Sequence, residues 1–417
     1  MVSSKRTVGL AAAVAVAGLM ALPVAAGAAE LSMWVRASAA NAAPHLVDLW
    51  NSSHDDKITL TVIPDDQMVT KLATGVQAGD VPDLVSFDLI YMPDFMRAGF
   101  LTDLTDQLKA DPDQAKVAKA YADLATYQDK LYGTAFLPDV SVLAWNKDLF
   151  KQAGLDPDKA PTSLAEIHAD AKKIRALGPD IYGYYFAGSC PGCNIFVTSP
   201  MMVASGAKLL PHDASEEPLQ APGVKEVLQE MHDMWAEGLI PASAQADNGQ
   251  NFVSLFESGK IGIQGAGGFL ISDMKKNAPN INFGIGILPG IKDGQQSAFV
   301  GGDVIAIPKG SKNEAVARKF ISWELADDAQ LEGLAKNNII PSRTDLATNN
   351  KYFTDPKVLA TAKAVGVGYV PWVFHFNDMV NSNSSPWIQM LQTAIFGGDV
   401  DGAIATAKQQ MKDIASQ

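Results

Sequence analysis

Strand-like and helix-like segments alternate near the start of the chain, and this alternation constrains the fold more than any other feature. Runs rich in branched and aromatic residues predict strands at residues 29–35, 57–64 and 82–88. Apolar residues at helical spacing predict helices at residues 45–53 and 66–79. Strands that alternate with helices form a parallel sheet covered by helices on both faces. The sequence therefore predicts an α/β fold.

The length of the chain predicts more than one hydrophobic core. The chain has 417 residues, of which 47% are hydrophobic and 19% are charged. Single cores stop growing at roughly 250–300 residues, so two lobes are expected. The formal net charge is −13, which disfavours binding to nucleic acid and to anionic lipid.

The first 28 residues predict a cleavable signal peptide. Lys5 and Arg6 precede an apolar run at residues 8–26, and Ala26-Gly27-Ala28 has the small-residue pattern of a cleavage site. A membrane anchor is the alternative, because the run is nearly long enough to span a bilayer. No cysteine lies near the cleavage point, so a lipid anchor is not expected. We expect a periplasmic protein of a Gram-negative bacterium.

The chain carries no recognisable catalytic motif. It contains no Gly-x-Ser-x-Gly elbow, no His-Glu-x-x-His pair and no Walker loop, and its six histidines are scattered. Neither a cofactor nor a metal ion is expected.

Both cysteines of the chain lie in the stretch SCPGCN, as Cys190 and Cys193. The spacing alone fits a redox centre, half a zinc site or a disulfide. An exported protein favours the disulfide. Zinc would need two further ligands, and a redox centre would need a thioredoxin-like setting that is not evident here.

Aromatic and polar residues gather where predicted strands end. In open α/β sheets, ligands bind outside the carboxyl ends of the strands. Aromatic faces stack on the C–H faces of sugars, and carboxylates accept hydrogen bonds from sugar hydroxyls. The residues with this placement are Trp34, Arg36, Ser38, Asp88, Asp139, Trp372 and His375.

Five separate stretches carry a resemblance to a known family. They lie in this order along the chain: ATGVQAGDVPDLVSFD (73–88), YGTAFLPDVSVLAWNKDLFKQAGLDPDKAPTSLAEI (132–167), FESGKIGIQGAGGF (256–269), FVGGDVIAIPKGSKNEAVARKFISWE (299–324) and NNIIPSR (337–343). Together they resemble the extracellular solute-binding proteins of ABC importers for carbohydrates, the group that includes the maltose-binding protein.

This resemblance implies a type II periplasmic-binding-protein fold. Two α/β lobes, each with a mainly parallel sheet flanked by helices, would enclose a ligand cleft. The chain would cross between the lobes near residues 137–140, 300–302 and 341–343. The N-terminal lobe would comprise residues 29–138 plus 302–341, and the C-terminal lobe residues 139–301 plus 342–417.

The resemblance also implies positions for ligand-binding residues. Asp88 follows a strand whose end often binds sugar hydroxyls, and Asp139 occupies the place of a hinge acid. Phe269 stands where many relatives carry a cleft tryptophan. The remaining implied positions are Gly302 and Asp303 at the second crossing, Arg343 after the third, Trp372 in the C-terminal aromatic segment, and Gly188, Ser189 and Asn194 around the cysteine loop, whose disulfide would hold the loop in one shape.

The implied function is capture of a sugar, oligosaccharide or polyol for delivery to ABC permease subunits, by a monomer without catalytic activity. One alternative is an anionic sugar derivative, amino-acid or peptide ligand, with Arg36 or Arg343 clamping an acidic group. A second alternative is a secreted carbohydrate-active enzyme with Asp88 and Asp139 as acid and base.

Overall fold

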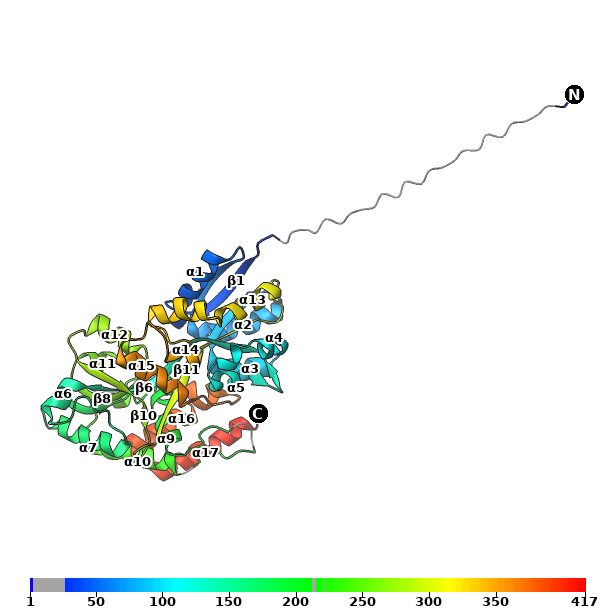
Figure 1. The fold of residues 1–417 in the computed structure, drawn as a ribbon. Coiled ribbons are helices and arrows are strands. Elements are labelled where there is room, and N and C mark those ends of the chain that lie inside the picture. Colours follow the sequence, from blue (N-terminus) through cyan, green and yellow to red (C-terminus); the bar gives the residue numbers. More distant parts are fainter. Residues whose placement is uncertain (3–26, 212–214, 221) are drawn as a thin grey trace.

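The computed structural model describes residues 1–2, 27–211, 215–220 and 222–417 (Figure 1). The positive and apolar parts of the predicted signal peptide therefore lie outside the described residues. Within the described ranges, no helix has both the length and the apolar character needed to cross a membrane.

Strands and helices alternate along most of the described chain. The strands are β1 (Glu30–Arg36), β2 (Lys57–Ile63), β3 (Leu84–Asp88), β4 (Thr126–Tyr127), β5 (Lys130–Leu131), β6 (Gly133–Asn146), β7 (Tyr182–Tyr185), β8 (Ile261–Gly267), β9 (Phe283–Gly286), β10 (Leu288–Pro289), β11 (Gln296–Ala306) and β12 (Gly368–Tyr369). The α-helices are α1 (Ala43–Ser53), α2 (Asp65–Ala78), α3 (Met92–Arg97), α4 (Thr105–Ala110), α5 (Lys119–Leu124), α6 (Lys147–Gln152), α7 (Leu164–Arg175), α8 (Pro191–Val197), α9 (Ser199–Ala204), α10 (Gly223–Ala236), α11 (Ser254–Glu257), α12 (Leu270–Asn277), α13 (Glu314–Glu324), α14 (Thr344–Ala347), α15 (Pro356–Gly366), α16 (Pro386–Leu391) and α17 (Val400–Ala415).

The main sheet has the strand order β2-β1-β3-β11-β6-β8-β7. The pairs β1–β2, β1–β3 and β7–β8 are parallel, as the strand–helix alternation predicts. The long strands β6 and β11 run antiparallel to each other, β11 is antiparallel to β3, and β6 is antiparallel to β8. The sheet is therefore mixed rather than mainly parallel, because the two long strands connect its halves.

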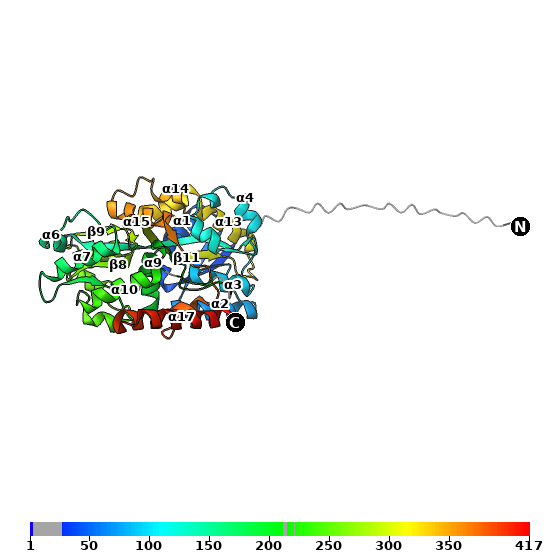
Figure 2. The ribbon, with the colours of Figure 1, turned by 90° about the horizontal axis from the view of Figure 1, so that it is seen from below.

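The molecule has the two predicted lobes. One contains α1, β1 with its neighbours β2 and β3, and α13, and the other contains α6, α7, α10 and β8 (Figure 1). In Figure 2, α6 and α7 lie at one end of the molecule, and α2, α3 and α13 lie at the other. β6 and β11 pass from one lobe to the other, with Gly301 opposite Asp139 and Gly302 opposite Pro138. We propose that the lobes divide there, with residues 29–138 plus 302–341 in the first and 139–301 plus 342–417 in the second.

The pairing of β11 with β6 requires a glycine at the point where both strands pass between the lobes. Gly302 has a φ of +92°, and a Cβ atom there would lie 2.1 Å from the carbonyl oxygen of Leu137. Only glycine satisfies both the left-handed backbone and this close approach.

The two faces of β1 are buried differently, and this positions the site. Leu31, Met33 and Val35 pack against α1 and α13 in one hydrophobic cluster. The alternate residues Trp34 and Arg36 therefore face the other side of the sheet, which is the side of α2. Side chains on this second face are free to reach the carboxyl ends of the neighbouring strands.

Candidate ligand-binding site

A charged cluster lies where β1 and β3 end, beside β11. The guanidinium of Arg36 donates from Nε to Oδ1 of Asp303 at 2.6 Å and from NH1 to Oδ2 of Asp88 at 2.8 Å. The hydroxyl of Ser86 donates to the second oxygen of Asp303 at 2.7 Å. The first lobe thus brings together three predicted site residues, Arg36, Asp88 and Asp303.

The charges of this cluster are largely satisfied internally. Burial by itself would lower the pKa of Arg36, but the adjacent carboxylates of Asp88 and Asp303 raise it well above its ordinary value. Burial raises the pKa of Asp303, whose side chain is only 3% exposed, while Arg36 and Ser86 act in the opposite direction. One cation faces two carboxylates, so the cluster has no excess positive charge.

Asp139 lies at the crossing between the lobes. Its Oδ1 accepts a hydrogen bond from the backbone N–H of Val140 at 2.8 Å. Burial is the main cause that raises the pKa of Asp139 to about 6, against the lowering effect of the backbone N–H groups of Val140 and Gly268. Nearby, the hydroxyl of Tyr121 donates to the carbonyl of Gly301 at 2.6 Å. A carboxyl group in this place can act as a hydrogen-bond acceptor whose charge changes near pH 6.

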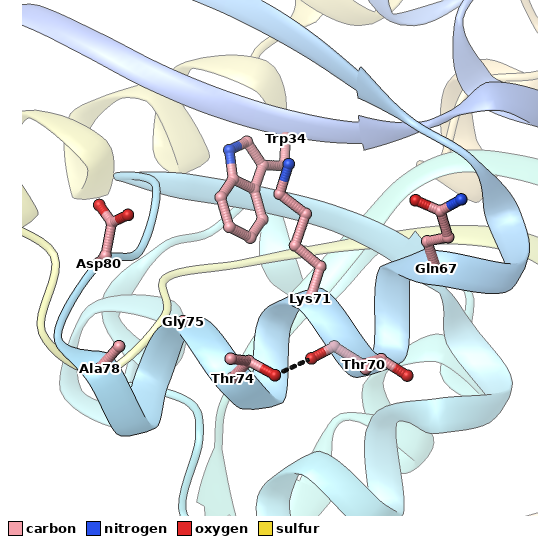
Figure 3. A pocket seen from close by; sticks show the side chains of 8 residues that line it. All are labelled: Trp34, Gln67, Thr70, Lys71, Thr74, Gly75, Ala78 and Asp80. Carbon is pink, nitrogen blue, oxygen red and sulfur yellow. Dashed lines mark hydrogen bonds between the residues drawn. The ribbon is translucent and has the colours of Figure 1, made fainter.

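Ser38 and Trp34 flank the charged cluster on opposite sides. Ser38 is exposed, and both its backbone N–H and its hydroxyl donate to Asp65 at the start of α2. Trp34 is half-buried and lines a groove along α2 (Figure 3). Trp34 thus lines this groove, and Ser38 is bonded to the start of α2.

In the second lobe, the carboxyl ends of the parallel strands β7 and β8 lie at one edge of the sheet. Ser189, which follows β7, lies at a pocket of about 470 Å³. Neutral amide and hydroxyl groups dominate its lining, and no charged residue contributes. The lining residues are Ser189, Asn248, Asn383, Ile388, Gln389, Gln392 and Thr393.

Of these lining residues, only Ser189 is predicted from the sequence. The side-chain amide of Gln392 donates to the carbonyl of Gly188 at 2.6 Å and to that of Gln245 at 3.0 Å. These bonds connect the helical segment Gln392–Phe396, which continues α16, to the cysteine loop. Gln389 donates to the carbonyl of Ser384 at 2.7 Å. The concentration of amides and hydroxyls in residues 381–393 was a usable signal for this pocket.

The cysteine loop is closed by a disulfide between Cys190 and Cys193, so the predicted disulfide is confirmed. Cys190 also caps α8, because its sulfur accepts from the N–H of Cys193 at 3.1 Å. Gly249 approaches both sulfurs so closely that a Cβ atom there would lie 2.9 and 3.0 Å from them. The disulfide thus packs closely against the segment that carries Asn248 and Gly249.

Two predicted ligand residues of this loop have structural contacts instead. The buried amide of Asn194 donates to the carbonyls of Ala187 and Cys190, at 2.7 and 2.9 Å. The N–H of Gly188 donates to the carbonyl of Ala244 at 2.8 Å, and a Cβ atom at Gly188 would collide with Phe396. These residues shape the loop, and Ser189 is the loop residue that reaches the pocket.

Phe269 follows the end of β8, as predicted, and remains 40% exposed. Its ring centroid lies 6.4 Å from that of Phe252. An exposed aromatic side chain at the carboxyl end of a strand is available to stack on a ligand.

Trp372 and His375 connect the C-terminal segment to the first lobe. The indole N–H of Trp372 donates to the carbonyl of Thr126 at 3.1 Å, and its ring stacks on Tyr127. The backbone N–H of His375 donates to Asp94, and Arg97 donates to its ring at 3.1 Å. These two predicted residues therefore contact α3 and the β4 turn.

Arg343 lies apart from the charged cluster of Arg36. Its side chain is 1% exposed and pairs with Asp113 at 3.0 Å, Asp327 at 2.5 Å and Asp345 at 2.6 Å. Its donors are thus already used by carboxylates within the protein. Among the residues that the structure describes, no group of three or more histidine, cysteine or acidic side chains is placed to hold a metal ion.

Comparisons with known proteins agree with this architecture. A binding protein of Brucella abortus is 26% identical over 88% of this chain and 89% of its own length. The diacetylchitobiose binding protein DasA of Streptomyces coelicolor is 24% identical over 86% of this chain and 87% of its own. The crystal structure of the cyclic α-maltosyl-1,6-maltose binding protein from Arthrobacter globiformis has a TM-score of 0.80, with 24% identity, and the match covers 94% of this chain and 100% of that one.

The family comparison gives the assignment directly. Residues 36–331 match the model of the bacterial extracellular solute-binding protein family. This range begins at Arg36 and includes the charged cluster, both long strands, the cysteine loop and Phe269. The chain belongs to the bacterial extracellular solute-binding protein family.

Proposed function

We propose that this protein captures a neutral sugar, oligosaccharide or polyol between its two lobes and delivers it to the permease subunits of an ABC importer. The relatives named above bind diacetylchitobiose and a cyclic maltosyl-maltose. We further propose that residues 1–28 are removed on export to the periplasm of a Gram-negative bacterium, and that the mature protein is a monomer without catalytic activity.

The observation that carries this proposal is the composition of the pocket beside Ser189. Amides can both donate and accept, so Asn248, Gln389 and Gln392 suit the paired donor and acceptor character of sugar hydroxyls. Ile388 adds an apolar contact for the C–H face of a sugar ring. Most ligand pockets have volumes of roughly 300–1,000 Å³, and this one falls within that range.

The charge distribution favours a neutral ligand over an anionic one. An anion clamp needs an arginine with unpaired donors. Arg36 is held by Asp88 and Asp303, and Arg343 is held by three carboxylates. Asp139 adds a further group that repels anions when it is ionised.

The same contacts argue against hydrolysis by a pair of acids. Asp88 accepts a hydrogen bond from Arg36 at 2.8 Å and another from the N–H of Ile90 at 3.3 Å, so its carboxylate oxygens are already engaged within the protein. A glycosidase needs two carboxyl groups free to exchange protons or attack the sugar.

A thermal-shift screen of the purified protein tests this function. The panel should contain monosaccharides, oligosaccharides, polyols, sugar acids, sugar phosphates and amino acids. A ligand that binds only the folded state raises its stability by about 2.7 kcal/mol at a concentration of 100 times Kd. We expect neutral saccharides to raise the melting temperature and to be recovered unchanged. A shift caused only by anions or amino acids, or the appearance of hydrolysis products, would overturn the proposal.

A further inference from the structure

A groove runs along α2 in the first lobe, away from the pocket beside Ser189 (Figure 3). It has a volume of about 540 Å³. The indole of Trp34 projects toward α2 at its centre, with Gln67 and Asp80 toward its two ends. Its lining residues are Trp34, Gln67, Thr70, Lys71, Thr74, Gly75, Ala78 and Asp80.

The lining of this groove has the chemistry that neutral sugars need. Gln67, Thr70 and Thr74 are exposed on α2 and provide an amide and two hydroxyls. They recur at intervals of three and four residues, so they share one face of the helix. On the adjacent strand β2, Thr59 and Thr61 are also exposed. The half-buried indole lines the same groove and offers an apolar surface.

The groove joins the charged cluster at its Gln67 end. Gln67 follows Asp65 by two residues, and Asp65 accepts the hydrogen bonds of Ser38 beside Arg36. Trp34 precedes Arg36 by two residues, so both side chains face the same side of β1. From Gln67 to Ala78, α2 extends for roughly 16 Å at 1.5 Å per residue.

Lys71 lies over the indole of Trp34. Its ammonium nitrogen lies 4.7 Å from the centroid of the Trp34 ring, and its side chain is exposed. A cation–π contact at such an exposed position is worth only about 0.5–1 kcal/mol. A sugar ring can therefore displace the ammonium group, which can then donate to the hydroxyls of that ring.

We infer that this groove is a second binding segment for a neutral oligosaccharide, which extends from the charged cluster along α2 over Trp34. The inference rests on the proposed function and makes it more specific, because it selects oligosaccharides over monosaccharides and polyols. A ligand that reaches the groove gains contacts that a shorter one cannot make.

Calorimetric titration with two oligomer series tests the inference. The probes are α-1,4-linked glucose and β-1,4-linked N-acetylglucosamine oligomers of one to five units. Thr74→Arg places a long side chain across the groove, and arginine is a better helix former than threonine. Trp34→Leu removes the indole by an independent change. Gln77→Arg is the matched control, because Gln77 is exposed on the same helix but does not line the groove.

For the wild type and for Gln77→Arg, we expect affinity to rise with oligomer length. Thr74→Arg and Trp34→Leu should lower affinity for the longer oligomers by about twofold to tenfold, as expected for loss of an aromatic contact. Both should leave the shortest oligomer that binds unaffected. If length dependence persists in both groove variants, or if they weaken every length equally, the groove is not a binding segment. If no oligomer of either series binds the wild type, the inference falls, whereas the sugar assignment falls only if the thermal-shift panel also finds no neutral saccharide.

Discussion

Individual side chains at the ligand site are held by contacts that the lobes themselves provide. Arg36 shows this most clearly, because its guanidinium pairs with one nearly buried carboxylate and one that is 28% exposed. A buried ion pair adds little net stability, but removal of one partner leaves the other charge buried and unpaired. Removal of the Arg36 cation and removal of the Asp88 charge should therefore have very different costs in stability.

Arg36→Met should lower the free energy of unfolding by about 3–5 kcal/mol, because it leaves Asp303 buried without its cation. Asp88→Asn should cost less than about 1.5 kcal/mol, because Asp88 is partly solvated. Urea unfolding measures both values. The double variant Arg36→Met/Asp303→Asn is the control and should recover part of the loss. Equal losses for Arg36→Met and Asp88→Asn would show that burial does not determine how much each charged group contributes to stability.

Asp139 should make stability depend on pH. Its pKa of about 6 in the folded protein exceeds its ordinary value of 3.8, so the folded state binds this proton more tightly than the unfolded state. The contribution of Asp139 to stability is thus greatest below pH 4 and is lost as pH rises through about 6. Asp139→Asn removes this dependence.

Relative to the wild type, Asp139→Asn should gain on the order of 1–3 kcal/mol in the free energy of unfolding as pH rises from 4 to 7. Urea unfolding at four pH values in this range gives the difference directly. A difference that stays constant across the range would mean that Asp139 titrates normally.

The secondary-structure elements place these side chains through their ends and their crossings. Ser163 caps α7 by accepting from the N–H of Glu166 at 3.1 Å, and Glu166 accepts from the N–H of Thr162 at 2.7 Å, as the capping pattern predicts. β6 and β11 have a different role, because these two strands run through both lobes and connect them. At Gly302, where the chain passes between the lobes, a Cβ atom would collide with the carbonyl oxygen of Leu137.

Gly302→Ala should destabilise the protein by several kcal/mol. The left-handed conformation alone costs a residue with a side chain about 1–2 kcal/mol, and the collision with the carbonyl of Leu137 adds to this. Gly99→Ala separates the two effects, because Gly99 has a φ of +70° but no atom within 4 Å of its Cβ position. Melting curves should show a much larger loss for Gly302→Ala, and equal losses would exclude a steric role for the crossing.

The whole molecule consists of two lobes, and each carries candidate ligand-binding groups. The first offers the charged cluster and the groove over Trp34, and the second offers the amide-lined pocket and Phe269. The segment with Trp372 and His375, which belongs to the proposed second lobe, reaches the first lobe through hydrogen bonds to α3 and to Thr126. Hinged closure brings such opposed surfaces together around a ligand.

Ligand binding should make the protein more compact. Small-angle X-ray scattering with a saccharide that raises the melting temperature should show a smaller radius of gyration than without it. A saccharide that causes no thermal shift is the control. The same data give the molecular mass and so test the predicted monomer. Identical scattering curves with bound and without bound ligand would argue against closure.

Local patterns in the sequence were sufficient for the α/β fold and the disulfide, whereas the places of the crossings came from the family resemblance and stay a prediction. Periodicity, caps and a single pair of cysteines act over a few residues, and their geometry is nearly the same in every protein. Only the tertiary structure decided which predicted residues are free to meet a ligand. Arg36 is neutralised by Asp303, 267 residues away, and Arg343 is enclosed by three carboxylates. Asn248, Gln389 and Gln392 join Ser189 because strand pairing and helix packing bring separate loops together. Such contacts depend on how distant segments of the chain pair and pack against one another, which no local pattern encodes.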